Sequence, residues 1–491
     1  MKRSSGILHH ISSLPGEYGI GDFGKEAYNF IDFLSKSSQK NWQILPLGIT
    51  GYGDSPYQSF SSFAGNPYFI DIDEFIKKQF ITEKEVKSYD LGYYYDSVDY
   101  HKLYKNKYKI LKIVYKNSYN IIEKELKTFY RNEKDWLRPF SLFMSLKENQ
   151  KEKSWLDWEE KYRKYDSKEV KEFEKNNQEK IFFWVFTQFY FYKQWEKIKK
   201  YSKDKGIKII GDLPIYVAED SADIWSNIEL FKLDNNLVPE KISGVPPDLF
   251  SKTGQLWGNP IYDWQKLKER NYSWWVKRIK HSFKLYDRLR IDHFRGFQAY
   301  WEVDYGSRNA VDGKWVKGPG IDFFNSIKKQ LGELDIIAED LGYLTKEVNK
   351  LIKETGYPGM KVLQFAFDGN SKNDYLPHNY TKNAVVYTGT HDNDTTKGWF
   401  QEKNNENQKY ILDYINTNFD KKISWDMIRI AWSSTADLSI APMQDFLNLG
   451  SESRMNTPST PRDNWKWRME KDKLNKNLSD KISHITKLYG R

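Results

Sequence analysis

Eight short apolar runs, each bounded by Gly, Pro or a charged residue, recur along this chain, and stretches with helical spacing such as 28–34 and 348–352 separate most of them. Runs that are apolar throughout are typical of strands buried on both faces. Eight such strands alternating with helices fit a closed (β/α)8 TIM barrel better than an open doubly wound sheet. The expected strands are residues 6–9, 42–46, 207–211, 288–292, 335–339, 362–367, 384–388 and 438–442.

The spacing of these runs is uneven. About 160 residues separate the second run from the third, and 73–205 is rich in Lys, Glu and Tyr with little Gly or Pro, which predicts a helical insertion. A second insertion, 218–282, reads as loop-rich and carries the segment 244–248, Gly-Val-Pro-Pro-Asp. The 49 residues after the eighth run are too few for a β-sandwich of about 100 residues. We therefore expect one catalytic barrel over 1–491, without a C-terminal β-sandwich domain.

Composition excludes several classes of function. The chain has no cysteine, which excludes a thiolate nucleophile, a disulfide and a cysteine-ligated metal. It has no long apolar run and no signal-peptide core, so we expect a cytoplasmic protein without a membrane partner. The net charge of +10 permits nucleic-acid binding, but the lysines are interspersed with acids and no nucleic-acid motif accompanies them. A solvated basic surface is the better interpretation.

One glycine-rich motif resembles the fingerprint of a dinucleotide-binding site. Residues 19–24 match G-x-G-x-x-G, but the expected strand before the motif and the acidic residue about 20 positions after it are missing. A loop that caps the next helix explains these glycines better than a dinucleotide site, and we expect no cofactor.

Three carboxylates stand at or just after the ends of expected strands. Arg290 and Asp292 alternate along one strand and so face the same side, where the arginine lowers the pKa of the acid, as suits a nucleophile. Glu339 ends the next run, whose apolar residues favour the raised pKa of a general acid. Asp392 follows His391 after the seventh strand. Taken singly, Asp292 and Arg290 could form a structural ion pair, and Asp392 could be a helix cap.

Acids at the C-terminal ends of three strands of one barrel favour a catalytic interpretation, because barrel active sites lie there. Two carboxylates about 5–5.5 Å apart are the machinery of a retaining glycosidase. The 18 Trp, 34 Tyr and 29 Phe are more than a core comfortably explains, and aromatic faces suit sugar sites. The rival is a divalent-metal site built from the same acids, which the missing phosphate-binding loops disfavour.

Three longer motifs resemble one family, the 4-α-glucanotransferases called amylomaltases or disproportionating enzymes, which are related to α-amylases. The resemblance runs along nearly the whole chain and is weakest in the helical insertion. The motifs are Gly-Tyr-Gly-Asp-Ser-Pro-Tyr-Gln-Ser-Phe at 51–60 with Gly-Asn-Pro-Tyr at 65–68, Gly-Asp-Leu-Pro-Ile-Tyr-Val at 211–217, and Arg-Met-Asn-Thr-Pro at 454–458 with Asn-Trp-Lys-Trp-Arg at 464–468.

The resemblance implies a role for each matching residue. Asp292 resembles the nucleophile, Glu339 the acid/base, and Asp392 the carboxylate that grips the 2- and 3-hydroxyls in the transition state. No metal or cofactor is implied, and the implied substrates are maltooligosaccharides, other α-1,4-glucans and glucose. Further residues are implied to bind substrate: Tyr57, Asp212, Arg290, His293, His391, the lid residues Phe250, Gln255 and Trp257, and, on a remote glucan-binding surface, Tyr100.

Three positions depart from the family pattern. Ser459 and Asp463 stand where glycine is expected, and Leu249 occupies a lid position that is often aromatic or small. These changes leave the acids intact and bear on acceptor preference. The sequence thus predicts a retaining 4-α-glucanotransferase. The alternatives are an α-amylase-type glucan hydrolase, because both reactions share their first half, and, from other classes, a catalytically silent glycan-binding barrel and a nucleic-acid binder.

Overall fold

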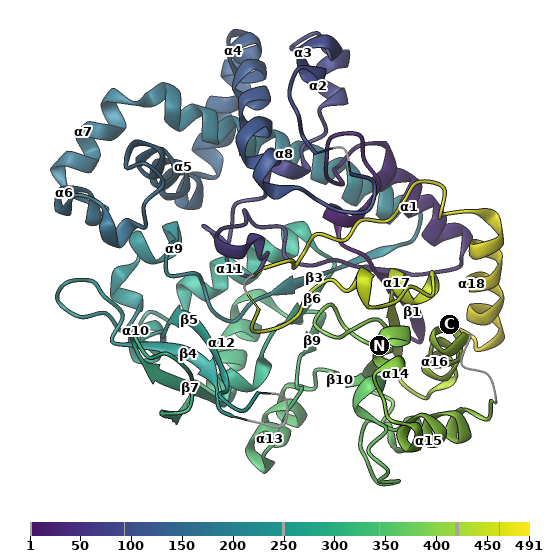
Figure 1. Ribbon diagram of the computed structural model, residues 1–491. Helices are drawn as coiled ribbons and strands as arrows, with labels where there is room; N and C mark the ends of the chain where they lie inside the picture. Colours follow the sequence, from purple (N-terminus) through teal and green to yellow (C-terminus); the bar gives the residue numbers. More distant parts are fainter. Residues whose placement is uncertain (1, 93, 248–250, 343, 418–421, 461) are drawn as a thin grey trace.

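The computed structural model describes residues 2–92, 94–247, 251–342, 344–417, 422–460 and 462–491. Its centre is a closed barrel of eight parallel strands in the order β1-β2-β3-β6-β9-β10-β11-β12, with β12 pairing back onto β1 (Figure 1). The predicted (β/α)8 barrel is confirmed. Its strands are Ser4–Leu8 (β1), Asn41–Gln43 (β2), Lys208–Leu213 (β3), Arg288–Ile291 (β6), Ile336–Ala338 (β9), Gly359–Val362 (β10), Ala384–Tyr387 (β11) and Leu438–Pro442 (β12).

The sixth barrel strand lies earlier in the chain than its apolar run predicts. β10 ends at Val362, and Leu363–Phe365 turn into a 3-10 helix. Leu363 is as buried as Val362, so the apolar run continues through the turn. Hydrophobicity reports burial and does not distinguish a buried strand from the buried turn that follows it.

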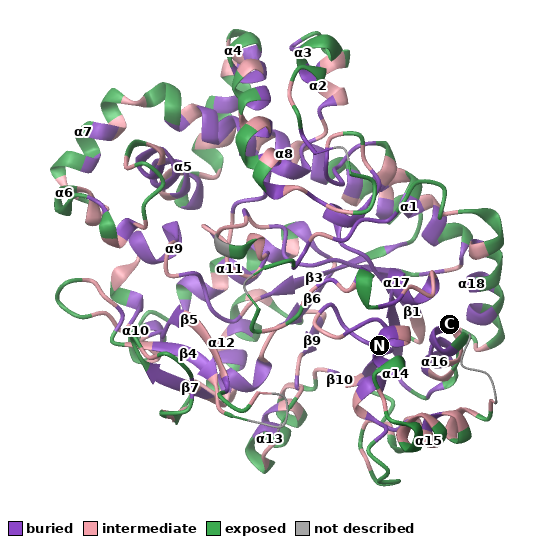
Figure 2. Cartoon of the chain, viewed as in Figure 1, coloured by how far each residue is buried: buried purple, intermediate pink, exposed green. Residues whose placement is uncertain are grey.

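Amphipathic helices cover the barrel. α1 (Lys25–Lys36) shows the pattern, because it buries Phe30, Ile31 and Leu34 on one face, while Lys36 lies exposed. Figure 2 shows the same division of buried and exposed faces along the outer helices. The other helices that follow barrel strands or the small sheet are α11 (Ser273–Leu285), α12 (Ile321–Leu331), α13 (Lys346–Thr355), α14 (Thr396–Gln401), α15 (Asn405–Ile415), α16 (Ile423–Ser433), α17 (Met443–Phe446) and α18 (Lys476–Leu488).

Between β2 and β3 the chain forms a cluster of helices on one side of the barrel (Figure 1). Its longest members are α4 (Tyr100–Asn132) and α8 (Gln178–Asp204), and α8 buries side chains all around its surface. The shorter helices are α2 (Asp73–Lys77), α3 (Glu83–Lys87), α5 (Lys134–Asn149), α6 (Glu160–Arg163) and α7 (Lys168–Asn176).

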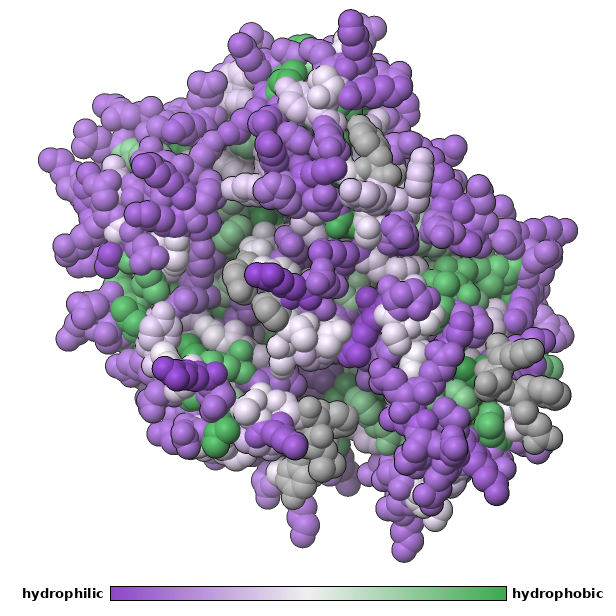
Figure 3. All heavy atoms as spheres, viewed as in Figure 1, coloured by the Kyte–Doolittle hydropathy of each residue, from purple (hydrophilic) through white to green (hydrophobic). Residues whose placement is uncertain are grey.

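The packing of these helices accounts for much of the aromatic surplus. Trp158 and Trp225 pack edge to face and, like Trp155 and Trp195, are almost wholly buried. Other aromatic side chains, such as Tyr94 and Tyr95, lie exposed, so the core takes up only part of the aromatic content. Figure 3 shows a largely hydrophilic face with scattered apolar patches.

An antiparallel sheet lies beside the barrel, where part of a loop-rich insertion was expected. Its order is β5-β4-β7-β8, formed by Lys241–Val245 (β4), Gln255–Pro260 (β5), Ala299–Asp304 (β7) and Gly313–Lys317 (β8). Two short helices, α9 (Ala222–Trp225) and α10 (Trp264–Glu269), flank β4 and β5 in the chain. The sheet presents residues of β5 to the end of β6, because the Trp257 ring contacts the His293 ring.

The chain after β12 adds helices and turns to the barrel. In the described part of 443–491 no strand continues the fold, apart from an isolated bridge between Ser97 and Trp467. Among the described helices, none is long and apolar enough to cross a membrane.

Candidate active site

The three predicted acids lie at the same end of the barrel. Asp292 comes directly after β6, and Glu339 comes directly after β9, its hydrogen-bonded neighbour. Asp392 lies in the loop of residues 388–395 that follows β11, here called the β11 loop. Because all eight strands are parallel, these positions meet at the C-terminal mouth, where barrels of this type place their reactive groups.

Arg290 links two carboxylates at this mouth. Its Nη1 atom lies 2.5 Å from Asp212 Oδ2 and 3.0 Å from Asp292 Oδ1. Asp212 and Arg290 are register partners on β3 and β6, which explains their contact. Burial lowers the pKa of the Arg290 guanidinium, but Asp212 and Asp292 raise it more, so that it lies well above its ordinary value. The group is a fixed positive charge beneath Asp292.

The pKa of Asp292 differs from the sequence-based expectation. Burial raises it, Arg290 lowers it, and the charges of Asp212 and Asp392 raise it again, to about 6. The predicted lowering by Arg290 exists but is outweighed, because burial and the charges of Asp212 and Asp392 raise the pKa. Asp292 is thus ionised above about pH 6, with 27% of its side-chain surface still exposed.

Glu339 differs from Asp292 in its protonation state near neutral pH. Burial raises the pKa of its carboxyl to about 8, and Asp292 adds to this effect, while Arg290 and a hydrogen bond oppose it. That hydrogen bond comes from the backbone N–H of His293 to Glu339 Oε2, at 2.6 Å. Near neutral pH one site therefore holds an ionised Asp292 and a protonated Glu339, which are the states of a nucleophile and a general acid.

The turn after β6 makes this bond to Glu339 possible. His293 has left-handed backbone angles, φ 50° and ψ 49°, which turn its N–H toward Glu339. Its ring meets the Trp257 ring edge to face, with centroids 4.7 Å apart. Burial lowers the pKa of His293 to about 3, so the ring is neutral, and its buried Nε2 has no hydrogen-bond partner among the described residues.

Asp392 is held from two sides. Its Oδ2 lies 3.3 Å from His391 Nε2, and its Oδ1 accepts a 2.6 Å hydrogen bond from the side-chain amide of Asn456. Burial raises the pKa of Asp392, but His391, Asn456 and Arg290 together bring it well below its ordinary value. The Asp392 carboxyl is therefore ionised throughout the neutral range, and 42% of its side-chain surface is exposed at the mouth. It does not cap the following helix, because Thr395 is the N-cap of α14.

Tyr57 connects Asp212, at the end of β3, with His391 in the β11 loop. Its hydroxyl lies 2.7 Å from Asp212 Oδ2 and 2.8 Å from His391 Nε2. Since an ionised carboxylate only accepts, the hydroxyl donates its one proton to Asp212 and accepts from His391, which places a proton on Nε2. The Tyr57 ring stacks on the His391 ring, 15° from parallel with centroids 5.2 Å apart.

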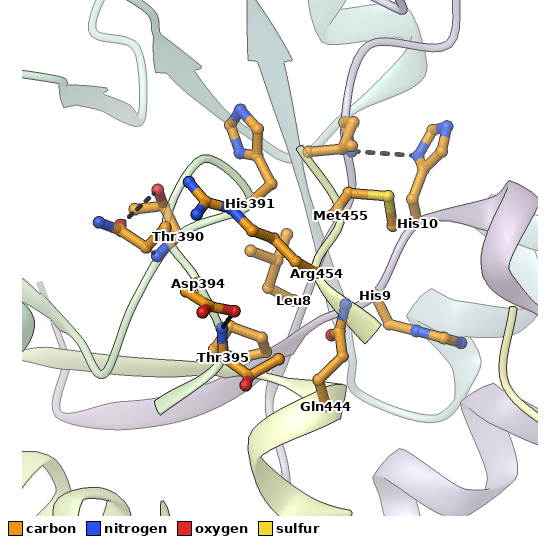
Figure 4. A pocket seen from close by; sticks show the side chains of 13 residues that line it. Leu8, His9, His10, Thr390, His391, Asp394, Thr395, Gln444, Arg454 and Met455 are labelled. Atoms are coloured by element: carbon orange, nitrogen blue, oxygen red, sulfur yellow. Dashed lines mark hydrogen bonds between the residues drawn. The ribbon is translucent and has the colours of Figure 1, made fainter. Parts of the chain in front are cut away.

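Hollows open beside this network. One, of about 410 Å³, lies between the ends of β1 and β12 and the β11 loop and is lined by His391, Asp394 and Arg454 (Figure 4). A second, of about 560 Å³, is lined by Tyr57, Asp212 and Tyr216. Among the described side chains, no group of three His, Asp or Glu is arranged to hold a metal ion.

The remaining predicted residues fall in different places. Gln255 and Trp257 lie together on β5, where Trp257 Nε1 donates to Gln255 Oε1 at 3.2 Å. Phe250 lies outside the described residues. Tyr100 is 7% exposed and donates its hydroxyl to the carbonyl of Trp465. Its place on a remote glucan-binding surface stays a prediction.

Two residues that contact Asp392 were not predicted individually as site residues. Arg454 and Asn456 belong to the Arg-Met-Asn-Thr-Pro signature, and both hydrogen-bond to Asp392. The signature indicated that the segment matters, but a separation of more than 60 positions from Asp392 hid the contact.

Comparison with known proteins defines the class. A profile of the glycoside hydrolase 77 family, described as 4-alpha-glucanotransferase, matches residues 9–474. The chain belongs to this family. It is 51% identical over 484 residues to the 4-alpha-glucanotransferase of Clostridium butyricum, covering 98% of this chain and 99% of the relative. It is 44% identical to that of Thermus thermophilus, covering 96% and 95%.

Solved structures agree with this membership. Amylomaltase from Streptococcus agalactiae, in complex with acarbose, superposes with a TM-score of 0.97 at 43% identity over the full length of both chains. Amylomaltase from Corynebacterium glutamicum superposes with a TM-score of 0.80 at 18% identity, covering 99% of this chain and 75% of that one, a similarity of fold.

Proposed function

We propose that this protein is a retaining 4-α-glucanotransferase in which Asp292 is the nucleophile, Glu339 the acid/base and Asp392 the transition-state carboxylate. The observation that carries the proposal is the placement of Asp292 and Glu339 directly after the neighbouring strands β6 and β9, with Arg290 3.0 Å from Asp292 and the His293 N–H bonded to Glu339. A retaining glycosidase mechanism needs this pair in its first step.

In the first half-reaction, a carboxylate oxygen of Asp292 bonds to the anomeric carbon of the donor glucan. The bond from that carbon to the glycosidic oxygen breaks, and Glu339 gives its proton to the departing oxygen. The product is a covalent β-glucosyl ester on Asp292. Arg290 stabilises the carboxylate before attack and after release, from 3.0 Å.

In the second half-reaction, the Glu339 carboxylate takes the proton of an acceptor's 4-hydroxyl, and the acceptor oxygen displaces Asp292 from the anomeric carbon. Double inversion retains the α configuration. Asp392 faces the mouth in ionised form and is suited to hold the 2- and 3-hydroxyls of the reacting sugar.

The other assigned residues divide between donor and acceptor. Tyr57, Asp212, His293 and His391 surround the donor sugar, and Gln255 and Trp257 on β5 contact the acceptor. Transfer exceeds hydrolysis where such an acceptor site keeps water out longer than sugar.

The names of the relatives support the substrate class, because they are 4-alpha-glucanotransferases, and the Streptococcus agalactiae amylomaltase was solved with acarbose. We expect maltooligosaccharides and related α-1,4-glucans as donors, these or glucose as acceptors, and a reaction in the cytoplasm.

Maltotriose tests the proposal and separates transfer from hydrolysis. We expect a ladder of longer and shorter oligomers together with free glucose, at a nearly constant number of reducing ends, because the transferred anomeric carbon passes from one glycosidic bond to another and never becomes a free reducing end. Chromatography of the products and a reducing-end assay on the same samples measure both quantities. Rising reducing ends with only shorter products would identify a hydrolase instead, and no reaction would favour a silent glycan-binding barrel.

A further inference from the structure

A short segment near the C-terminus fastens the β11 loop. Residues 451–456, here called the C-terminal strap, make three side-chain hydrogen bonds to that loop. Ser451 Oγ donates to Asp394 Oδ2 at 2.6 Å, Arg454 Nη2 donates to the backbone carbonyl of Asp392 at 2.7 Å, and Asn456 Nδ2 donates to Asp392 Oδ1 at 2.6 Å. Two of these three bonds end on Asp392. The strap therefore fixes both the backbone and the carboxylate of one residue.

Arg454 is the centre of this arrangement. While its Nη2 holds the Asp392 carbonyl, its Nε donates to the backbone carbonyl of Asn456 at 2.7 Å. The Arg454 guanidinium thus links the backbone of Asp392 to the backbone of Asn456, whose side-chain amide bonds to the Asp392 carboxylate. Figure 4 shows the guanidinium end of Arg454 directed toward the part of the β11 loop that carries Thr390 and His391. A lysine ammonium has no planar fork and does not reproduce this bidentate bridge.

The strap is itself anchored. The N–H of Arg454 donates to the carbonyl of Ser451 at 3.1 Å, and the Met455 side chain is 6% exposed. The carbonyl of Met455 accepts a 2.7 Å bond from the N–H of Trp465. The arginine therefore extends from a fixed backbone, and its bonds restrain the β11 loop.

The contact of His391 with the Asp392 carboxylate is longer than the contact of Asn456. His391 Nε2 lies 3.3 Å from Oδ2 and also contacts the Tyr57 hydroxyl at 2.8 Å. Without the strap, this shared contact alone would orient a carboxylate with 42% of its side-chain surface exposed. The strap supplies the second, shorter contact and so determines the plane of the carboxylate.

We propose that Arg454 is a positioning residue for the transfer reaction, acting through Asn456 and the backbone of Asp392 to hold that carboxylate in its productive orientation. This inference rests on the proposed role of Asp392. A misplacement of about 1 Å caused by a residue that does not touch the reacting atoms costs roughly 10²-fold in rate. The loss falls on kcat more than on KM, because an interaction strengthened in the transition state is the one removed.

The test compares Arg454→Ala, Arg454→Lys and Asn456→Ala with the wild type on maltotriose, with unfolding temperatures measured alongside. We expect kcat to fall about 100-fold in both Arg454 variants and about tenfold in Asn456→Ala, with KM changed by less than about threefold. Millimolar guanidinium should restore part of the kcat of Arg454→Ala, whereas methylammonium should not. Arg462→Ala, which removes an exposed arginine from the neighbouring segment, is the matched control and should keep the wild-type rate.

The outcomes separate this inference from the proposed function. A wild-type kcat in Arg454→Lys, or a rise in KM at constant kcat, would overturn the positioning role. If the Arg454 variants fail to fold, Asn456→Ala decides, and a wild-type kcat there overturns the inference as well. Asp392→Asn is measured in parallel. If it remains active, the role proposed for Asp392 fails, whereas an inactive Asp392→Asn with a fully active Arg454→Ala rejects the strap alone.

Discussion

Replacing Asp292 by Asn should abolish transfer, lowering kcat on maltotriose by on the order of 10⁴-fold or more. The amide is nearly the same size as the carboxylate but has no negative charge, so it does not form the ester with the anomeric carbon. The side chain still fits beside Arg290 at the end of β6, where the carboxylate now lies 3.0 Å from the guanidinium. Steady-state kinetics with chromatographic detection of glucose measure the effect.

The control for this substitution is Asp480→Asn, on the exposed face of α18. This change removes the same charge from the chain without touching the barrel mouth, and should leave kcat unchanged. Activity of Asp292→Asn within tenfold of the wild type, with both variants folded, would refute the assignment of the nucleophile.

The pH dependence of kcat/KM should be bell-shaped, with an acidic limb near pH 6 and a basic limb near pH 8. Below about pH 6 Asp292 binds a proton and no longer attacks, and above about pH 8 Glu339 loses the proton that the leaving oxygen needs. Because the two acids influence each other, the limbs report the pair as a coupled system. Initial rates on maltotriose between pH 4 and pH 10, on the order of a dozen points, define both limbs.

The variant Arg290→Met tests whether Asp292 and Glu339 cause the two limbs of the pH profile. Arg290 lowers the pKa of both Asp292 and Glu339, so its loss should move both limbs to higher pH, by roughly 1–2 units, and reduce activity at pH 7. Arg288→Met is the matched control on the same strand, because Arg288 pairs with Asp335, 2.6 Å away, outside the acid cluster. Limbs that stay in place in Arg290→Met would mean that other groups control the pH dependence.

The barrel could be predicted because its strands are buried on both faces. Runs such as 207–211 and 384–388 are apolar except for Lys208 and Thr388, a pattern typical of strands buried on both faces. The small antiparallel sheet could not be predicted in the same way. β7 mixes Trp301 and Glu302, and β8 carries the exposed Trp315 between lysines, so neither strand gives a continuous apolar signal.

The site was predictable where it depends on strand ends and unpredictable where it depends on loops. Asp292 and Glu339 follow their strands directly, so the parallel arrangement alone brings them together. The contact of Asn456 with Asp392 depends on the path of a segment 64 residues further along the chain. The raised pKa of Asp292 could not be predicted from the sequence either, because it depends on burial and on the sharing of Arg290 with Asp212.

The most direct test of the account is to isolate the covalent intermediate on Asp292. Glu339→Gln is mixed with α-maltosyl fluoride, whose fluoride leaves without an acid, while the glutamine cannot activate an acceptor to remove the sugar. We expect a burst of fluoride, a mass increase of one maltosyl group on the intact protein, and a modified peptide in which Asp292 carries the sugar. Fluoride release without an adduct, or an adduct on another residue, would contradict it.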